Sequence, residues 1–534
     1  MVNTNIMDNR YRLFGETTPA EQFRKEWADY LENNNLEGRI ILNNAPNRIG
    51  KTITTLKSLE KTDAKILYLA DRHNHISEVE ATLNNPRVVH WWGMRKLCQQ
   101  KDNPSYNFLI ENHVPAGFTC QSCMYKKECP YWMQWHINED SIVGAPKELL
   151  PTKYVSKNDW DYIIFDEIID KAQRVEPYCK PIKNETMDSH NLTLLKITYD
   201  ILKDIIGDQT TADEETLSYF KEELKDINSN YLPRLIRQIK YEGHIDNDIK
   251  PVLGLMSRFR STVEWLELCA EHGFKTHFYK PYLYDVLDLQ NKYQSNVILL
   301  NTSLKNQFYE KMVSNYQYQL PTVEEFPFHF ENKNSLLLHY NYKARSCSKI
   351  GLDNYGAEIY IMAKNLIRFG NKKGLKTGII TFKNQNHIFT KETDVVSYFG
   401  GHQGSNTFDD VDLLIILGTY HINPDGLYQK YFMLTNQLLI DDPARWNNFQ
   451  HINGARITLS DNTLLNELKL YKLNEEHGQA IFRSGAHVQN GKIVIVFGYV
   501  PEDVTNILEY NKFRTEKGAK ISISKWLKKT KHHK

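Results

Sequence analysis

Short apolar runs separated by longer amphipathic stretches occupy two parts of the chain. In the first part the runs are Ile40–Leu42, Ile66–Ala70, Ser141–Val143, Tyr162–Phe165 and Asn296–Leu300. In the second part they are Ser335–His339, Thr377–Thr381, Leu413–Leu417 and Lys492–Phe497. Because buried strands that alternate with helices form parallel sheets covered by helices, the pattern predicts an α/β protein with two parallel-sheet lobes.

Two stretches interrupt this alternation in the first lobe. Residues 93–135 are rich in cysteine, aromatic and basic residues. Residues 185–275 instead show helical spacing, seen at Leu192, Leu195, Tyr199, Leu202 and Ile206. Within the second stretch, Thr211–Glu214 has the form of a capping box that begins a further helix. We therefore expect a cysteine-rich insertion and an all-α insertion in the first lobe.

A chain of 534 residues is too long for a single hydrophobic core, so several domains are expected. The expected division is a first lobe in three parts (1–92, 136–180 and 286–325), a four-cysteine domain (93–135), a helical domain (181–285), a second lobe (326–510) and a basic tail (511–534). The hydrophobic content of 41% and the charged content of 25% are typical of water-soluble globular proteins. No signal-peptide pattern and no run of ~20 apolar residues occurs, so we expect a cytoplasmic protein without a membrane segment.

Positive charge is concentrated at the carboxyl end of the chain. The net charge of the whole chain is +1, but residues 512–534 carry eight lysines and one arginine against Glu516. A basic tail that contains Trp526 could follow a phosphate backbone and stack on a base. A solvated, disordered end is the equally good alternative.

A candidate phosphate-binding loop follows the first apolar run. Ala45–Thr52 reads Ala-Pro-Asn-Arg-Ile-Gly-Lys-Thr and opens a predicted helix, which is the context that such a loop requires. Backbone N–H groups and the helix N-terminus would hold the β-phosphate of a nucleotide. Lys51 would reach the β- and γ-phosphates, and the Thr52 hydroxyl would bind Mg²⁺. With Gly50, these residues form the expected ATP site.

The second half of this site is a hydrophobic strand that ends in two acids, Asp166 and Glu167. Asp166 at the carboxyl end of a strand can hold Mg²⁺ through water, and Glu167 can orient the attacking water. The strand could instead end in a solvated acidic turn, but its pairing with the upstream loop favours a nucleoside triphosphatase.

These residues resemble the superfamily 2 helicases, and in particular the XPD/DinG-like iron–sulfur family. The Ala-Pro-x-x-x-Gly-Lys-Thr form of the loop is similar to that superfamily's own variant, and Asp166-Glu167-Ile-Ile stands where the family has D-E-A-H. The resemblance spans about residues 38–500. It implies two RecA-like lobes and identifies the helical insertion as an arch-like domain.

Further motifs match in the family's order. They are Ala70–His73, Gly93–Cys98, Ile142–Leu150, Asn301–Leu304, Gly404–Asn406 with Asp409 and Asp410, Leu417–Thr419, and Gln479–Arg483. By resemblance, Gln479 and Arg483 contact the γ-phosphate from the second lobe. The last motif departs from the family at two positions, because Phe482 replaces a glycine and Ala486 stands where a second arginine is expected.

The cysteines at 98, 120, 123 and 129 have the spacing C-x21-C-x2-C-x5-C. Four thiolates of this kind suit either a tetrahedral Zn²⁺ or an iron–sulfur cluster, and three buried cysteines elsewhere (Cys179, Cys269 and Cys347) are expected in the core. The resemblance favours a structural [4Fe–4S] cluster, because the family carries its four-cysteine domain between the same two ATPase motifs. Zinc and unliganded buried thiols remain as alternatives.

The resemblance implies a monomeric, ATP- and Mg²⁺-dependent DNA helicase that moves 5′ to 3′ on single-stranded DNA or at a single-strand/duplex junction. No protein partner is indicated. Two other functions stay open. The first is a nucleic-acid-stimulated ATPase or remodeller that does not unwind. The second is a zinc-stabilised replication protein with a vestigial ATPase.

Overall fold

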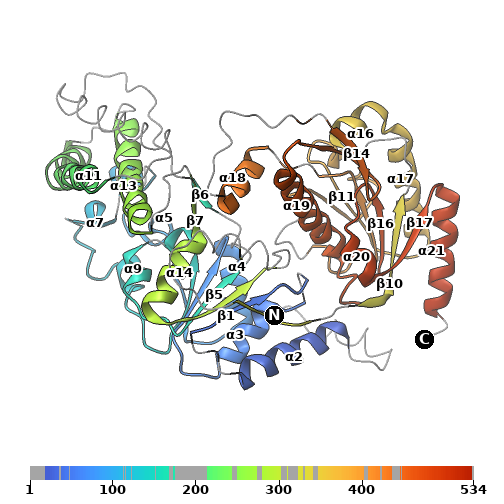
Figure 1. Cartoon of the computed structure of the whole chain (residues 1–534), viewed down its shortest axis with the longest axis horizontal. Helices are drawn as coiled ribbons and strands as arrows, with labels where there is room; N and C mark the ends of the chain where they lie inside the picture. Colours follow the sequence, from blue (N-terminus) through green and yellow to red (C-terminus); the bar gives the residue numbers. More distant parts are fainter. Residues whose placement is uncertain are drawn as a thin grey trace.

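Two α/β lobes lie beside each other, and a helical region extends from the first lobe (Figure 1). The computed structural model describes residues 18–34, 36, 38–46, 49–111, 114, 116–121, 123–150, 152–166, 172–174, 213–242, 249–272, 279–301, 310, 323–328, 331–340, 347–401, 407–420, 422, 424–435, 446 and 448–531. No helix among these residues is long and apolar enough to cross a membrane.

The first lobe contains a seven-stranded sheet in the order β3-β4-β2-β5-β8-β1-β9, and every pairing within it is parallel. The strands are β1 (Ile40–Asn43), β2 (Ile66–Ala70), β3 (Val88–His90), β4 (Ile142–Pro146), β5 (Tyr162–Asp166), β8 (Asn296–Leu300) and β9 (Val323–Glu325). β1, β2, β4 and β8 are buried almost along their whole length, as expected for strands with helices on both faces.

Helices cover both faces of this sheet. On one face, Ile41 and Tyr68 pack with side chains of α2 (Pro19–Asn33), α3 (Lys51–Leu59) and α4 (His73–Leu83). On the other face, Ile40 and Leu42 pack with α14 (Tyr282–Tyr293). Successive residues of β1 therefore enter different cores, because side chains alternate along a strand.

The second lobe contains a six-stranded parallel sheet in the order β12-β11-β13-β16-β10-β17. The strands are β10 (Asn332–Tyr340), β11 (Thr377–Thr381), β12 (Val395–Tyr398), β13 (Leu413–Leu417), β16 (Ile493–Phe497) and β17 (Leu508–Phe513). α16 (Lys349–Tyr355), α17 (Ala357–Lys372) and α21 (Glu516–Lys531) cover one face, and α20 (Glu502–Ile507) and the end of α19 (Thr463–Ile481) cover the other. The prediction of two parallel-sheet α/β lobes is confirmed.

The two lobes also contact each other. Leu427 and Tyr431 of α18 (Pro424–Thr435) and Leu465 of α19 belong to the same hydrophobic cluster as Trp265 and Leu287 of the first lobe. The first part of α19 therefore packs against the first lobe while its last turns pack on the sheet of the second lobe.

The two insertions of the first lobe share a core. The cysteine-rich stretch forms four short helices, α5 (Met94–Leu97), α6 (Pro104–Glu111), α7 (Ala116–Thr119) and α8 (Pro130–Met133). The helical insertion forms α11 (Glu214–Asp226), η3 (Ile227–Tyr231), α12 (Leu232–Arg237), η4 (Gln238–Glu242) and α13 (Ile249–His272), and β6 (Ala172–Arg174) pairs with β7 (Tyr279–Pro281) at its base. Phe108 and Leu109 of α6 pack with Phe220 and Val263 of the helical insertion. Because they share this core, the two insertions form one packed region.

One local expectation is corrected, and another falls on residues that the structure does not describe. The cap of α11 is Asp213, whose side chain accepts a hydrogen bond from the Thr216 amide at 2.8 Å, rather than Thr211, which lies outside the described residues. The heptad-like stripe between residues 192 and 206 also lies outside them.

The basic end of the chain is neither a free tail nor a base-stacking element. The expected boundary between residues 510 and 511 falls inside β17, and the basic stretch beyond it forms α21. Ala519, Ile523 and Trp526 lie on one face of α21 and pack into the core of the second lobe, where Trp526 is 4% exposed. Trp526 is therefore unable to stack on a base, and the lysines of α21 lie on the outside of a folded helix.

The close approach of α4 to the sheet gives a test of the packing in the first lobe. A Cβ on Gly144 of β4 would overlap Cγ2 of Ile76, a buried β-branched side chain with little freedom to move. We expect Gly144→Ala to destabilise the first lobe by about 2 kcal/mol, because overpacking forces strain into a close-packed core. Scanning calorimetry would show this as a lower Tm of the first-lobe transition.

Gly117→Ala is the matched control, since a Cβ at that helical position meets no atom within 4 Å. An unchanged Tm for both variants would contradict the packing of α4 against β4.

Candidate functional site

The described part of the loop between β1 and α3 ends in a left-handed glycine. Gly50 caps α3 with φ of 102°, a left-handed value that favours glycine. A Cβ at this position would also lie 3.0 Å from Nε of Arg24, which donates a hydrogen bond to the Ile49 carbonyl. Residues 47 and 48 of the loop lie outside the described residues. The left-handed turn therefore favours glycine at position 50, and any larger residue would also have to displace the Arg24 side chain.

Lys51 begins α3 and lies over this loop. Its side chain is buried, and Nζ donates a hydrogen bond to the Ala45 carbonyl at 2.5 Å. The amide of Ala45 is in turn held by Oδ1 of Asn43, at the carboxyl end of β1. A cation placed beside a helix N-terminus is the arrangement that stabilises the phosphates of a nucleotide.

Asp166 is at the carboxyl end of β5 and reaches the same helix. Its Oδ2 accepts hydrogen bonds from Oγ1 of Thr52 and from the hydroxyl of Tyr68, each at 2.9 Å. Burial raises the pKa of Asp166, while the hydrogen bonds from Thr52 and Tyr68 and the charge of Lys51 lower it. A divalent cation bound here would hold the carboxylate ionised, and a hydroxyl with a carboxylate is a donor pair that suits Mg²⁺.

The structure brings together four of the predicted nucleotide-site residues: Gly50, Lys51, Thr52 and Asp166. Glu167, the predicted water-orienting acid, lies outside the described residues. Tyr68 was not predicted from the sequence. Its place near Asp166 follows from the register that pairs β2 with β5. Its hydroxyl adds a third polar group to the end of β5.

Gln479 and Arg483 are in the second lobe, near the end of α19 and in the turn η6 (Phe482–Ser484). Arg483 is buried, at 7% exposure. Val488, five residues further along, packs against the first-lobe cluster that contains Ile49. The segment after Arg483 therefore contacts the first lobe on the face of the sheet that α2, α3 and α4 cover.

A column of rings and charges connects the first lobe to the cysteine-rich insertion. His73 and His90 both stack on Trp92, with centroid separations of 4.6 and 3.8 Å, and Nζ of Lys96 lies 3.3 Å from the centroid of the Trp92 ring. Burial lowers the pKa of His90 to about 4, so this ring is neutral at physiological pH. Nearby, Lys147 forms an ion pair with Asp71, which ties the turn after β4 to the turn after β2.

The cysteines 98, 120, 123 and 129 lie in one electrostatic neighbourhood. Burial, helped by the charges of the other three thiols, raises the pKa of Cys120 to about 11, although a hydrogen bond with Trp132 lowers it. Burial lowers the pKa of Lys240, and the thiols of Cys98, Cys120 and Cys123 counteract part of this effect. Four thiols with a neighbouring ammonium have the donor chemistry of a metal–thiolate site. Within the described part of the chain, however, no three His, Cys, Asp or Glu side chains form a group that could hold a metal ion.

The other cysteines are divided between the described core and the rest of the chain. Cys269 and Cys347 are buried, as predicted, and Cys179 lies outside the described residues.

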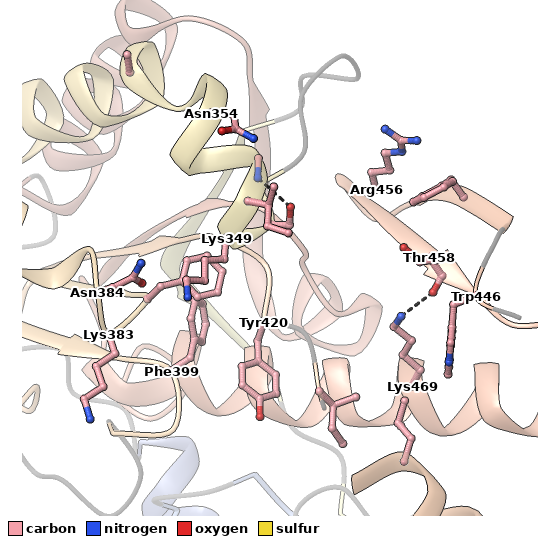
Figure 2. A pocket seen from close by; sticks show the side chains of 18 of the residues that line it. Lys349, Asn354, Lys383, Asn384, Phe399, Tyr420, Trp446, Arg456, Thr458 and Lys469 are labelled. Carbon is pink, nitrogen blue, oxygen red and sulfur yellow. Dashed lines mark hydrogen bonds between the residues drawn. The ribbon is translucent and has the colours of Figure 1, made fainter. Parts of the chain in front are cut away.

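A cleft of about 1330 Å³ is present in the second lobe. Figure 2 shows Lys349, Asn384 and Lys383 on one side of it and Arg456 and Thr458 on the other, with Tyr420 between them. Its lining includes four cations (Lys349, Lys383, Arg456 and Lys469) and one carboxylate, Glu358. Aromatic rings (Phe382, Phe399, Tyr420, Trp446 and Phe449) supply much of the remaining surface. A cationic cleft lined with rings is suited to a flexible polyanion that carries flat groups.

Sequence reasoning did not find this cleft. Its lining comes from five separated segments: α16 with the start of α17, the turn after β11, Phe399 just after β12, the segment from Tyr420 to Leu427 after β13, and residues 446–469. The one local signal was Asn453-Gly454, a dipeptide typical of a tight hairpin turn.

No family model and no curated protein matches this chain. Among solved structures it is similar to an XPD helicase, at 14% identity and a TM-score of 0.48 over 93% of this chain and 99% of the other. It is also similar to an apo XPD (13% identity, TM-score 0.45, 93% of this chain and 100% of the other) and to Xpd4 of S. tokodaii (11%, 0.44, 92% and 100%). The strand order of the two sheets and the phosphate loop after β1 define the two lobes.

Proposed function

We propose that this protein is an ATP-driven motor that moves along single-stranded DNA and separates strands, with 5′ to 3′ polarity by resemblance. The observation that carries the proposal is the hydrogen bond of 2.9 Å between Thr52 and Asp166 beneath the buried Lys51. It places a hydroxyl, a carboxylate and an ammonium at the carboxyl edge of a parallel sheet, where nucleotides bind in α/β folds.

In this proposal, Lys51 and the loop amides neutralise the β- and γ-phosphates of ATP. Thr52 and Asp166 hold Mg²⁺, and Glu167 orients the water whose oxygen attacks the γ-phosphorus as the bond to the β-phosphate oxygen breaks. Gln479 and Arg483 contact the γ-phosphate from the second lobe, so that the nucleotide joins the lobes before hydrolysis and releases them afterwards. Alternate closing and opening of the lobes would advance the strand.

Four thiolates at Cys98, Cys120, Cys123 and Cys129 would hold a structural [4Fe–4S] cluster at the point of strand separation. The shared electrostatic neighbourhood of the thiols supports this, as does the core that the cysteine-rich and helical insertions have in common. The cluster would cross-link a small domain and would take no part in ATP hydrolysis. We further propose a monomer located in the cytoplasm.

The first test removes the ammonium from the phosphate loop. Lys51→Ala should lower ATP turnover by about 100-fold or more, because no other cation of α3 can neutralise the phosphates. Binding of a single-stranded 20-mer, measured by fluorescence anisotropy without nucleotide, should stay within a factor of two. Lys57→Ala, which removes an exposed lysine of the same helix, is the control and should turn over ATP like the wild type. Full turnover by Lys51→Ala would rule out the proposed nucleotide site.

The second test concerns the metal. Anaerobically purified protein should show a broad absorption shoulder near ~400 nm, as thiolate-bound iron does. Cys120→Ser should remove the shoulder and lower the stability of the small domain, whereas Cys347→Ser, at a buried cysteine outside the cluster, should keep the shoulder. Zinc by elemental analysis, without the shoulder and without nucleotide binding, would instead favour a zinc-stabilised replication protein with a vestigial ATPase.

A second candidate function is a nucleic-acid-stimulated ATPase that remodels without unwinding. The observation that favours it is the buried Ala486, which stands where the resemblance expects a second arginine. A strand-displacement assay beside a strand-stimulated ATPase assay separates the two functions. Stimulated hydrolysis without displacement would identify the non-unwinding enzyme.

A further inference from the structure

One wall of the cleft in the second lobe is a β-hairpin that is anchored by its turn. β14 (Asn448–Ile452) and β15 (Ala455–Leu459) are antiparallel and joined by Asn453-Gly454, with φ of 46° and 85°. Positive φ at both turn residues is the geometry that matches the twist of a two-residue hairpin. The Asn453 carbonyl accepts a hydrogen bond from the Val500 amide at 3.2 Å, and a Cβ on Gly454 would overlap the ring of His339. The turn is therefore held against the sheet of the lobe.

The two faces of the hairpin differ. On the inner face, Ala455, Ile457 and Leu459 pack against Leu473 of α19 and against Tyr499. Phe449 pairs directly with Thr458, and His451 with Arg456, so these four side chains share the outer face. A packed inner face and an anchored turn hold the outer face in a fixed position.

Phe449 on this outer face is 54% exposed. The guanidinium of Arg456 lies over its ring at 4.1 Å from the centroid, and both residues line the cleft. Phe449 shares the cleft lining with four other rings, and contiguous apolar surface of this kind marks a ligand-binding groove. The ring and the guanidinium together present a flat surface with a positive charge.

The other wall carries two lysines beside aromatic rings, and Nζ of Lys383 lies 5.5 Å from the centroid of the Tyr398 ring. Lys349 and Lys383 line it and form no ion pair with any described residue, so their charges face the solvent of the cleft (Figure 2). At the base, Nζ of Lys469 donates to the Thr458 carbonyl at 2.6 Å and lies 4.5 Å from the centroid of the Trp446 ring. The wall with Lys349 and Lys383 is thus suited to phosphates, and the hairpin wall is suited to a flat, apolar group attached to them.

We propose that Phe449 and Arg456 of this hairpin form a stacking platform for an unpaired base of the nucleic-acid strand, while Lys349 and Lys383 hold its backbone on the opposite wall. The inference rests on the proposed function, from which it takes a single strand as substrate, and adds the element that contacts the bases. An unpaired base offers its π-face to a side chain, whereas bases within a duplex cover each other's faces. Stacking of this kind is independent of sequence, as a translocating motor requires.

The test compares two fluorescein-labelled 20-mers by anisotropy at one salt concentration, oligo(dT) and a strand of abasic spacers with the same number of phosphates. The wild type should prefer oligo(dT). Phe449→Ala should bind oligo(dT) about tenfold more weakly, as loss of one base–aromatic stack does, and bind the abasic strand as before. Phe449→Trp should restore the preference. Lys349→Ala should weaken both probes to the same extent, because it removes a backbone contact.

Ile361→Ala is the control for the loss of an exposed apolar side chain, since Ile361 on α17 is 59% exposed and does not line the cleft. It should leave both affinities unchanged. The stacking platform would be overturned if Phe449→Ala lost affinity equally for the two probes, or lost as much affinity for a 20-base-pair duplex. A wild type that binds neither probe, with ATP hydrolysis unaffected by oligo(dT) or oligo(U), would overturn the proposed function itself. The two failures are therefore distinguishable.

Discussion

The hydrogen bond between Thr52 and Asp166 depends on the order of the strands in the first sheet. β8 lies between β1 and β5, so the loop that follows β1 and the acid that ends β5 are two strand spacings apart, about 10 Å. The gap is closed by the first turn of α3, which begins after the left-handed Gly50 and brings the Thr52 hydroxyl to Asp166. The backbone amide of Asn301, just after β8, donates a hydrogen bond to the Asn43 carbonyl at 3.1 Å. This bond fixes the carboxyl ends of β8 and β1 relative to each other. A different strand order would leave Lys51 and Asp166 in separate parts of the molecule.

This constraint explains which parts of the site could be predicted from the sequence. Lys51, Thr52 and Asp166 each follow or end an apolar run, and the carboxyl ends of parallel strands meet at one edge, so their proximity follows from the fold class. Tyr68 lies inside such a run and is indistinguishable there from any other core aromatic. Its role depends on the register between β2 and β5, which no local pattern specifies.

The carboxyl end of the chain shows how charge can obscure a packing signal. Ala519, Ile523 and Trp526 are spaced for one face of a helix, but the lysines between them have the composition of a free tail. The core of the second lobe decides the outcome by burying that face. The start of α11 is a smaller case of the same kind, because Asp213 and Thr211 are both good capping residues, and Asp213 is the residue whose side chain accepts from the helix amide.

α19 gives the proposed motor a physical link between its two ligands. Lys469 in its second turn lines the cleft, and Nε2 of His477 accepts a hydrogen bond from the amide of Tyr420, another lining residue, at 3.0 Å. Gln479 follows within the same turn, and Arg483 lies just beyond the end of the helix. Because a packed helix moves as a unit, a strand that shifts the cleft wall and a γ-phosphate that attracts Arg483 would act on one rigid body. The two sites can then be coupled without any contact between their ligands. It is enough that α19 has two positions and that each ligand binds more tightly to one of them.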